Sequence, residues 1–531
     1  MRGIISNHMN KIVIYGGDLP AIAAAAKAAS TAMTATIHLI VPYVPRKLGG
    51  IATVGGQNYW DYVSPLTQQG TFGWLVSYGI GYNTEDLAAE LLKSLNKYSN
   101  IQIHWGYDIC DYTTVSNPYR ITSVTIKPLC LDTDKRVNWG SGVVQTLTAD
   151  IFIDASVEGR LARMVNSACT TGRYCWPNLP AGEVVGKVAK QAAATLMVKL
   201  KGIDHTQSGS GFHYSQDPAS GAWSCWGGSV EYKDSSSKIA AFNKKYAAQG
   251  YMIKPVNAAQ NGKNSDEWWV NTFLVFNVDG RANHRDKGTR FYPAMLEGTK
   301  NVDDAWVDAR QFLKDKKTEV LGALREYPGF SKADFVTDSA GYPEVGDVLY
   351  IRETVHMARS STYTGADDEN ENYHVGATAA LRAGASSGDG ADSKYYAHRI
   401  GLAHYNADIH PYDPSDCQNG SEWLWGYDSF RKMRPDMNIG NSDPVHPVYL
   451  PYEAILTHYV SNLLLPGYAA NISSFAWGEV RVLCNLCVLG DAAGVTAAYC
   501  IINNLQPLYL KDSQIADIQA LLLTVDAKLD K

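Results

Sequence analysis

The sequence predicts an α/β fold, in which a parallel-sheet domain is assembled from both ends of the chain and an α+β lobe is inserted between them. A β-branched strand at Lys11–Tyr15 runs into paired glycines and then into an alanine-rich helix at Pro20–Ser30. A second apolar strand at Thr36–Val41 completes a βαβ unit, whose length is typical of a nucleotide-binding half. Near the C-terminus, an apolar run ends in Gly490-Asp491 and small residues, which indicates a return to regular structure and a second glycine-rich segment of the same domain.

The bulk properties indicate a large, ordinary globular protein and argue against some classes of partner. At 531 residues the chain is long enough for two or three lobes. A net charge of −6, without a dense Lys/Arg run, argues against nucleic acid or an anionic membrane as the main partner. The sequence has no window of about 18 apolar residues, so no membrane span is predicted. The nine scattered cysteines and a polar N-terminus without the pattern of a secretory signal predict a cytoplasmic location. The oligomeric state stays open.

Helical and strand-like periods alternate after the βαβ unit. Leucines at helical spacing predict a helix at Glu85–Tyr98. The period then shifts to two, which predicts a β-meander followed by a strand that ends in Asp154. Its strand-like runs are Ile101–Cys110, Arg120–Pro128 and Val143–Ile153.

The middle of the chain gives weaker signals. Gly202–Asn301 is rich in Gly, Ser, Trp and Asn and predicts an irregular substrate-side region. An amphipathic helix is predicted at Val302–Glu326, and the polar Asp367–Asp392 is a candidate mobile loop. Regular structure is predicted again from Pro447, with a strand at Asn462–Leu465 and a helix that begins after Gly490-Asp491.

The turn Gly16-Gly17-Asp18-Leu19-Pro20-Ala21 occupies the place of a G-x-G-x-x-G/A loop, whose backbone amides bind a pyrophosphate. Gly16 and Ala21 fill the first and third positions. Asp18 replaces the second glycine, where a carboxylate would repel a phosphate. The acid that binds a ribose hydroxyl, about 20 residues further on, would fall at Val41. Taken alone, the motif leaves open a dinucleotide site or a plain βαβ core.

A second glycine-rich segment, Leu48–Gly56, follows the second strand. Its Gly49, Gly50, Thr53 and Gly55 allow backbone to lie against a flat ring or a phosphate, and a flexible loop is the alternative.

The third glycine-rich segment is Cys487–Gly494. A helix N-terminus at Gly490 would face a phosphate or the pyrimidine edge of a flavin, and Asp491 would accept hydrogen bonds from ribityl hydroxyls. Ala493 and Gly494 would allow a close approach, although tight helix packing explains the same small residues.

In combination these segments resemble the family of FAD-dependent oxidoreductases, some of whose members are labelled xanthan lyase. The resemblance runs over most of the chain, and it rests on the order and spacing of many blocks. The blocks are Val13–Gly17, Leu39–Pro42, Leu48–Asp61, Phe152–Leu161, Gly172-Arg173, Ile351–Thr354, Arg399–Gly401, Asp408–His410, Leu450–Tyr452, Asn462–Leu464, Arg481 and Gly490–Gly494.

The resemblance implies FAD as the cofactor and a split Rossmann-like FAD-binding domain with an inserted α+β substrate lobe. The implied FAD-binding parts are residues 11–170 and 441–531, with the substrate lobe at 171–440. Asp154 and Gly159 join the residues expected to bind the cofactor.

The chain departs from the family at three positions. Relatives often have Thr, Ser or Ala where Asp18 stands, and an acid where Val41 stands. Many carry a His at the position of Phe475. These departures affect the expected cofactor affinity and activity more than the fold.

Catalytic candidates are His410, which could move a proton during hydride transfer, and Arg481, which could hold a substrate carboxylate or steady a reduced flavin. A structural role is the alternative for each. Arg352-Glu353 is expected to form a buried pair between lobes.

No metal site is predicted. Cys484 and Cys487 have C-x-x-C spacing without a second pair, so they are expected to be core thiols on an apolar strand. His398, His404 and His410 are each six residues apart, which is not a helical metal spacing.

The function that follows is removal of a hydride from a small, polar organic substrate to flavin N5, with the final acceptor open. The alternative is a degenerate flavoprotein fold that acts as a binding or structural subunit with weak or no FAD, as Asp18, Val41 and Phe475 suggest. Replacement of Asp18 by glycine is expected to tighten FAD binding.

Overall fold

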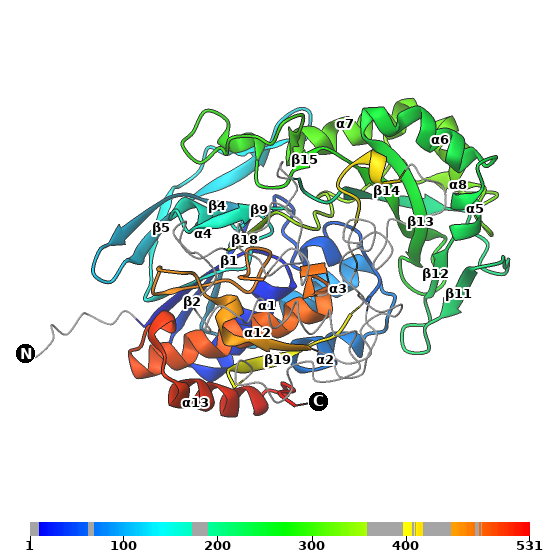
Figure 1. The fold of residues 1–531 in the computed structure, drawn as a ribbon. Coiled ribbons are helices and arrows are strands. Elements are labelled where there is room, and N and C mark those ends of the chain that lie inside the picture. The colour runs from blue at the N-terminus through cyan, green and yellow to red at the C-terminus, as the bar shows by residue number, and fades with distance from the viewer. Residues whose placement is uncertain are drawn as a thin grey trace, which may run out of the picture.

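The fold was analysed in a computed structural model (Figure 1). The residues that it describes are 10–61, 68–172, 190–357, 397–405, 408, 410–417, 448–472, 477–478 and 480–530. Arg173, Phe475 and the candidate loop Asp367–Asp392 lie outside these ranges.

The first lobe is built on a five-stranded parallel sheet with the order β21-β8-β1-β2-β3. The predicted strands Lys11–Tyr15 and Thr36–Val41 are confirmed as β1 and β2. β21 comes from the C-terminal part of the chain, so the two ends of the chain share one sheet. The remaining strands of the sheet are β3 (Ile101–Trp105), β8 (Ile151–Asp154) and β21 (Leu463–Leu464).

Two long helices pack together beside this sheet, α1 (Leu19–Thr31) and α12 (Leu483–Asn503) (Figure 1). The prediction that the last long helix begins after Gly490-Asp491 is wrong, because α12 begins two turns earlier. Cys484 and Cys487 therefore lie in a helix, not on a strand. α12 is apolar and long enough to cross a membrane, but 89% of its apolar window is buried inside the protein, as in a core helix. The lobe also contains α2 (Gly70–Val76), α3 (Thr84–Leu95), α4 (Arg160–Met164) and α13 (Asp512–Leu523).

The β-meander is present, with boundaries that differ from those predicted. The run Ile101–Cys110 is divided at Gly106, whose φ of 65° turns the chain from the parallel sheet into the meander. The run Val143–Ile153 likewise divides between a meander strand and β8. The meander strands are β4 (Tyr107–Val115), β5 (Arg120–Leu131), β6 (Val137–Trp139) and β7 (Gln145–Thr148).

The second lobe is a six-stranded antiparallel sheet covered by helices, so the prediction of irregular structure at Gly202–Asn301 is wrong. The predicted helix Val302–Glu326 is two helices that meet at Lys316. The strands are β10 (Ala194–Lys201), β11 (Phe212–Gln216), β12 (Trp223–Gly227), β13 (Tyr251–Gln260), β14 (Glu267–Val275) and β17 (Asp334–Phe335). The helices are α5 (Ser229–Lys233), α6 (Lys238–Tyr246), α7 (Val302–Asp315) and α8 (Lys317–Leu324).

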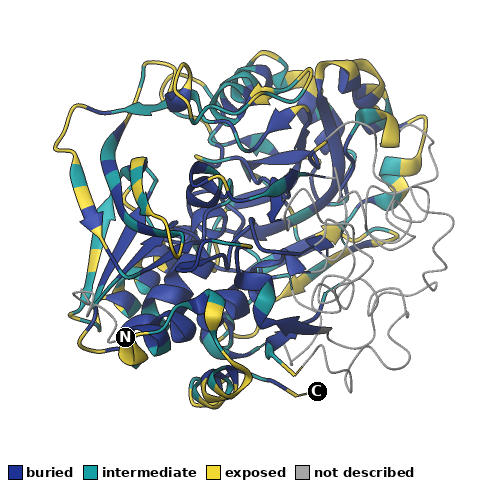
Figure 2. Cartoon of the chain, turned by 60° about the vertical axis from the view of Figure 1, so that its left-hand side comes forward, coloured by how far each residue is buried: buried dark blue, intermediate teal, exposed yellow. Residues whose placement is uncertain are grey.

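Each lobe has its own hydrophobic core. Apolar residues of α1, α12 and the parallel sheet form one, and those of β10, β13, β14, α6, α7 and α8 form the other. Figure 2 shows both cores as buried ribbon inside a partly exposed shell. Short elements join the lobes, among them η1 (Gly50–Ala52), β9 (Cys169–Thr171), β15 (Val278–Asp279), η4 (His284–Asp286), β16 (Lys300–Asn301), β18 (Val355–Met357), β19 (Arg399–Ala403), β20 (Val448–Pro451) and η8 (Tyr452–Ile455).

Candidate functional site

The main cavity opens at the carboxyl edge of the parallel sheet, where β1, β2 and β8 end. It holds about 1280 Å³ of empty space, its solvent-open mouth included. Its walls come from both lobes: the loops that follow β1, β2 and β8 on one side, and residues near η4, α7 and Tyr350 on the other. The carboxyl edge of a parallel α/β sheet is where such folds bind nucleotides.

The turn after β1 is as tight as the motif predicts. Gly16 lines the cavity with φ at 136°, and a Cβ atom there would lie 2.9 Å from the carbonyl oxygen of Ala155. Only glycine fits that position without a shift of backbone. A Cβ on Gly17 would clash with the ring of Tyr43, and Ala21 is buried in the first turn of α1.

Asp18 points across the cavity wall toward the second glycine segment. Its carboxylate accepts hydrogen bonds from the hydroxyl of Tyr43 (2.6 Å) and from the backbone N–H of Ile51 (3.1 Å). The residue is 6% exposed and lines the cavity. Burial raises the pKa of its carboxyl, although both hydrogen bonds act to lower it.

The second glycine segment folds back on itself around η1. Gly49 and Gly50 have φ values of 110° and 52°, and a Cβ on Gly50 would overlap the carboxylate of Asp18. The hydroxyl of Thr53 donates to the carbonyl of Leu48, and the N–H of Gly55 donates to Gly50. These residues shape the loop, while Ile51 and Val54 lie in the cavity wall.

The segment after β8 forms the neighbouring part of the wall. Asp154 is fully buried and accepts hydrogen bonds from Ser156 and from the N–H of Ala162, so it holds the turn into α4. Gly159, with φ at 57°, is the N-cap residue of that helix. Neither lines the cavity, whereas Ser156 and Glu158 between them do. The sequence argument selected this segment but missed Glu158.

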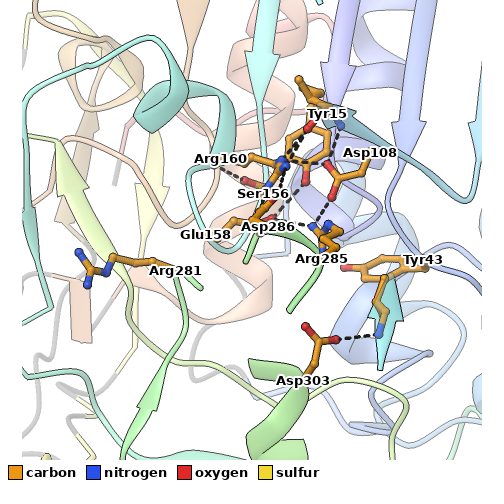
Figure 3. A network of polar contacts seen from close by, with 12 residues as sticks. Tyr15, Tyr43, Asp108, Ser156, Glu158, Arg160, Arg281, Arg285, Asp286 and Asp303 are labelled. Carbon is orange, nitrogen blue, oxygen red and sulfur yellow. Dashed lines mark hydrogen bonds and ion pairs between the residues drawn. The ribbon is translucent and has the colours of Figure 1, made fainter. Parts of the chain in front are cut away.

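A buried ionic network connects Glu158 to the first lobe and to η4 (Figure 3). Arg160 binds Asp286 through two hydrogen bonds of 2.5 and 2.9 Å, and it also pairs with Asp108 at 3.1 Å. Arg285 pairs with Asp108 as well. Because Arg285 and Asp286 belong to η4 while Arg160 begins α4, the network ties one of the segments that join the lobes to the first lobe.

The third glycine-rich segment lies elsewhere in the protein. Gly490 and Gly494 are in the interior of α12, where a Cβ would lie 2.4 Å from backbone oxygens of Pro20 and Ala24 in α1. The predicted helix N-terminus at Gly490 is therefore wrong, and these glycines allow close helix packing. Asp491 accepts hydrogen bonds from the N–H and the hydroxyl of Thr71, and Ala493 is fully buried.

The two catalytic candidates meet at Asp408. Arg481 donates to its carboxylate at 2.5 Å, and Nε2 of His410 lies 3.4 Å from its other oxygen. Arg481 also donates to the hydroxyl of Tyr350 at 3.1 Å, and Tyr350 lines the main cavity. The His410–Asp408–Arg481 group lines a separate small pocket, and Tyr350 links it to the main cavity.

Electrostatics keep this group in defined charge states. Burial, followed by Arg352, Arg481 and Lys254, lowers the pKa of His410 well below its usual range, so its ring is neutral near pH 7. Burial also works against the charge of Arg481, but Asp408 and nearby tyrosines raise its pKa above the ordinary value.

Two nearby ionisable residues were not found by the sequence argument. Burial and then Asp408 raise the pKa of Asp61 to about 6, and burial lowers the pKa of Lys254 far below normal. Neither has a local sequence signal, because their neighbours come from distant segments.

The expected pair Arg352–Glu353 does not form. Arg352 donates to the carbonyl of Ala193 and the hydroxyl of Thr195, whereas Glu353 binds His356 at 2.8 Å. Within the described part of the chain, no group of three or more His, Cys, Asp or Glu could hold a metal ion.

The cavity fits an adenine dinucleotide in most respects. It lies at the expected sheet edge, its Gly16 turn is cramped as such loops are, and Arg285 presents a buried Nε that has no hydrogen-bond partner among the described residues. Two residues depart from the usual dinucleotide-binding pattern. Asp18 adds a carboxylate at the position of the second glycine, and Val41 stands where a ribose-binding acid is expected. The lining therefore fits FAD apart from these two positions.

Solved structures give weak similarities. The myxobacterial chondrochloren halogenase CndH is 10% identical, with a TM-score of 0.33 over 73% of this chain and 79% of that one. The p-nitrophenol 4-monooxygenase PnpA of Pseudomonas putida DLL-E4 is 9% identical, with a TM-score of 0.30 over 65% and 69%. THI4 of Thermovibrio ammonificans is 13% identical, with a TM-score of 0.23 over 31% of this chain and 64% of that one.

Sequence comparison is more decisive. No curated protein matches the chain. The model of the family described as FAD dependent oxidoreductase, however, matches residues 11–522. Because this match spans nearly the whole sequence, the chain belongs to the family of FAD-dependent oxidoreductases, with FAD as its cofactor.

Proposed function

We propose that the protein oxidises a small, polar organic molecule by removing a hydride from one of its C–H bonds. Bound FAD would supply the hydride acceptor at N5. The observation that carries the proposal is the position of the neutral His410, which is linked to the main cavity by a chain of contacts through Asp408 and Arg481 to Tyr350 in the cavity wall. The chain would work in the cytoplasm, and all cysteines in its described part are free thiols.

The cavity walls would hold the cofactor without a strong side-chain anchor for its phosphates. The turn at Gly16 brings backbone amides to the start of α1, where a pyrophosphate is favoured. Ile51, Val54 and Leu349 add apolar wall. Asp18 acts against phosphate binding, because its carboxylate already accepts the N–H of Ile51.

His410 is the proposed general base. A neutral imidazole can take the proton that a hydroxyl or amine loses as its carbon is oxidised. Burial among Arg352, Arg481 and Lys254 disfavours the imidazolium, so the proton would pass onward readily. Asp408, 3.4 Å from Nε2, is placed to orient the ring.

Arg481 is proposed as a positioning residue. Its guanidinium donates to the carbonyl and carboxylate of Asp408 and to the hydroxyl of Tyr350. These bonds use the planar fork of the side chain. It therefore holds Asp408 and Tyr350 in place, and we do not assign it a substrate carboxylate.

The second candidate is a flavoprotein fold retained as a binding subunit with weak or no FAD. The carboxylate of Asp18 at the start of α1 favours it, since that position ordinarily faces a phosphate.

The absorbance spectrum of the purified protein separates the two candidates. Bands at roughly 370 and 450 nm are expected from bound flavin. A colourless protein that FAD does not stabilise against heat would favour the second candidate.

For a yellow protein, anaerobic mixing with a panel of small alcohols, amines and hydroxy acids tests the reaction. At least one compound is expected to bleach the band near 450 nm, about 100-fold more slowly in His410→Asn than in the wild type. A panel that leaves the spectrum unchanged would count against hydride transfer from this substrate class.

A further inference from the structure

The strand that usually supplies a ribose-binding acid has none in this protein. β2 ends at Val41, which is fully buried and apolar. In dinucleotide-binding folds, an acid near this point accepts hydrogen bonds from the ribose hydroxyls of the adenosine half. A ribose at this edge of the sheet would need its acceptor from elsewhere.

β1 has a second parallel neighbour, β8, whose carboxyl end lies at the same edge. The chain leaving β8 carries Glu158 into the cavity wall. Glu158 is held from beneath by Tyr15, the last residue of β1, whose hydroxyl donates to Oε1 at 3.1 Å. Glu158 therefore supplies an acid next to β1, but after β8 and not at the end of β2, where the ribose-binding acid usually lies.

Glu158 is the carboxylate that the ionic network uses least. Arg160 is saturated by Asp108 and Asp286. Arg285 also pairs with Asp108, while its contact with Oε1 of Glu158 is 3.7 Å long. The three carboxylates of Asp108, Asp286 and Glu158 thus face two guanidinium groups. The contacts of Glu158 with the side chains of Tyr15 and Arg285 both use Oε1.

A buried carboxylate whose oxygens accept few hydrogen bonds lowers the stability of the protein when no ligand donates to it. The Glu158 side chain is 13% exposed, and burial, followed by the charge of Asp108, raises the pKa of its carboxyl. A buried carboxylate in this position gains stability from any hydroxyl that donates to it.

Arg285 adds a donor next to this acceptor. It lines the same cavity, and its Nε is buried without a hydrogen-bond partner in the described part of the chain. Figure 3 shows Tyr15, Glu158 and Arg285 gathered at one place in the network. Together they offer an acceptor and a donor, which is the complement of a ribose with its hydroxyl and ether or phosphate oxygens.

We propose that Glu158, assisted by Arg285, binds the ribose hydroxyls of the adenosine half of FAD and replaces the acid that is missing at the end of β2. The proposal rests on the binding of FAD in this cavity and adds a residue to that site.

The test compares FAD with an analogue that carries 2′,3′-dideoxyadenosine in place of adenosine. Dissociation constants are measured by isothermal titration with the full-length apoprotein and with Glu158→Gln. The wild type is expected to bind FAD about tenfold or more tightly than the analogue, as for a hydrogen bond to a charged group. Glu158→Gln is expected to bind both cofactors within about twofold of each other, because the charged acceptor is gone.

Glu344→Gln is the matched control. Glu344 forms an ion pair with Lys199 at 2.8 Å in the second lobe and does not line the cavity. Its variant is expected to discriminate between the cofactors as the wild type does.

Each outcome decides the proposal. Equal affinity of the wild type for the two cofactors would overturn it without any variant, as would full discrimination by Glu158→Gln. If Glu158→Gln does not fold, Glu158→Asp, which withdraws the carboxylate by one methylene, must lose most of the discrimination. A wild type that binds neither cofactor would instead overturn the assignment of FAD to this protein.

Discussion

The hydroxyl of Tyr43 donates a hydrogen bond of 2.6 Å to the carboxylate of Asp18, at the start of α1. Tyr43 follows β2 and Asp18 follows β1, so this bond joins two loops that line the main cavity. The N–H of Ile51 donates to the other carboxylate oxygen. The carboxylate of Asp18 thus occupies the hydroxyl of Tyr43 and the N–H of Ile51 as hydrogen-bond donors in the region where a pyrophosphate would be bound. It also brings a negative charge to that region.

The first prediction is that Asp18→Gly and Asp18→Asn tighten FAD binding by roughly tenfold or more, because both remove a charge that repels the pyrophosphate. Asp18 forms no side-chain cap on α1, so little helix stability is lost. Isothermal titration of the apoproteins measures the effect. Unchanged or weaker affinity in both variants would contradict this account of the loop.

The second prediction concerns pH and the same residue. Because burial raises the pKa of Asp18 in the folded state, the folded protein holds that proton more tightly than the unfolded chain. This contribution to the free energy of unfolding is complete below the ordinary pKa of about 4 and is lost as pH rises through the folded pKa.

Asp18→Asn, which does not titrate, should therefore gain stability relative to the wild type as pH rises from about 4 to 7. Thermal unfolding of both apoproteins across this range provides the measurement. A difference in Tm that stays constant with pH would show that Asp18 does not titrate as proposed.

Local sequence signals predicted the first βαβ unit well. Lys11–Tyr15 and Thr36–Val41 are β-branched runs bounded by turn residues, and their ends agree with the structure. β13 was missed because nearly all of its residues are buried on both faces, so no alternation of apolar and polar residues marks it. The start of α12 was missed for a related reason: a short apolar run does not separate a buried strand from a buried helix.

The candidate site was predicted only in part. Gly16 and Asp18 line the cavity as expected, and His410 and Arg481 come together although 70 residues separate them in the sequence. Glu158 could not be selected from its segment. Its proposed role in binding depends on its contacts with Tyr15 and with Arg285, which are distant in the sequence. Such contacts between distant segments leave no local pattern.

The third prediction tests the group around Asp408. Arg481→Met should lower the free energy of unfolding by about 3 kcal/mol, because it leaves a largely buried carboxylate without its partner. The double variant with Asp408→Asn should be less destabilised than the sum of the single variants by about 1 kcal/mol or more. Denaturant unfolding of the four proteins gives these values, and additive effects would contradict the ion pair.

The last prediction decides between two roles for the glycines of α12. If Gly490 serves helix packing, Gly490→Ala should destabilise the protein by roughly 1–3 kcal/mol, because its Cβ would lie 2.4 Å from the carbonyl oxygen of Pro20. The higher helix propensity of alanine does not offset such an overlap. Gly322→Ala in α8 is the control: apart from the neighbouring backbone of its own helix, no atom lies within 4 Å of its Cβ position, so the propensity gain of about 0.5–1 kcal/mol should appear. Denaturant unfolding measures both, and titration of each refolded variant with FAD measures the cofactor. A Gly490→Ala protein of normal stability that binds FAD poorly would return Gly490 to the cofactor site, whereas an unstable protein with normal affinity assigns it to the contact between α1 and α12.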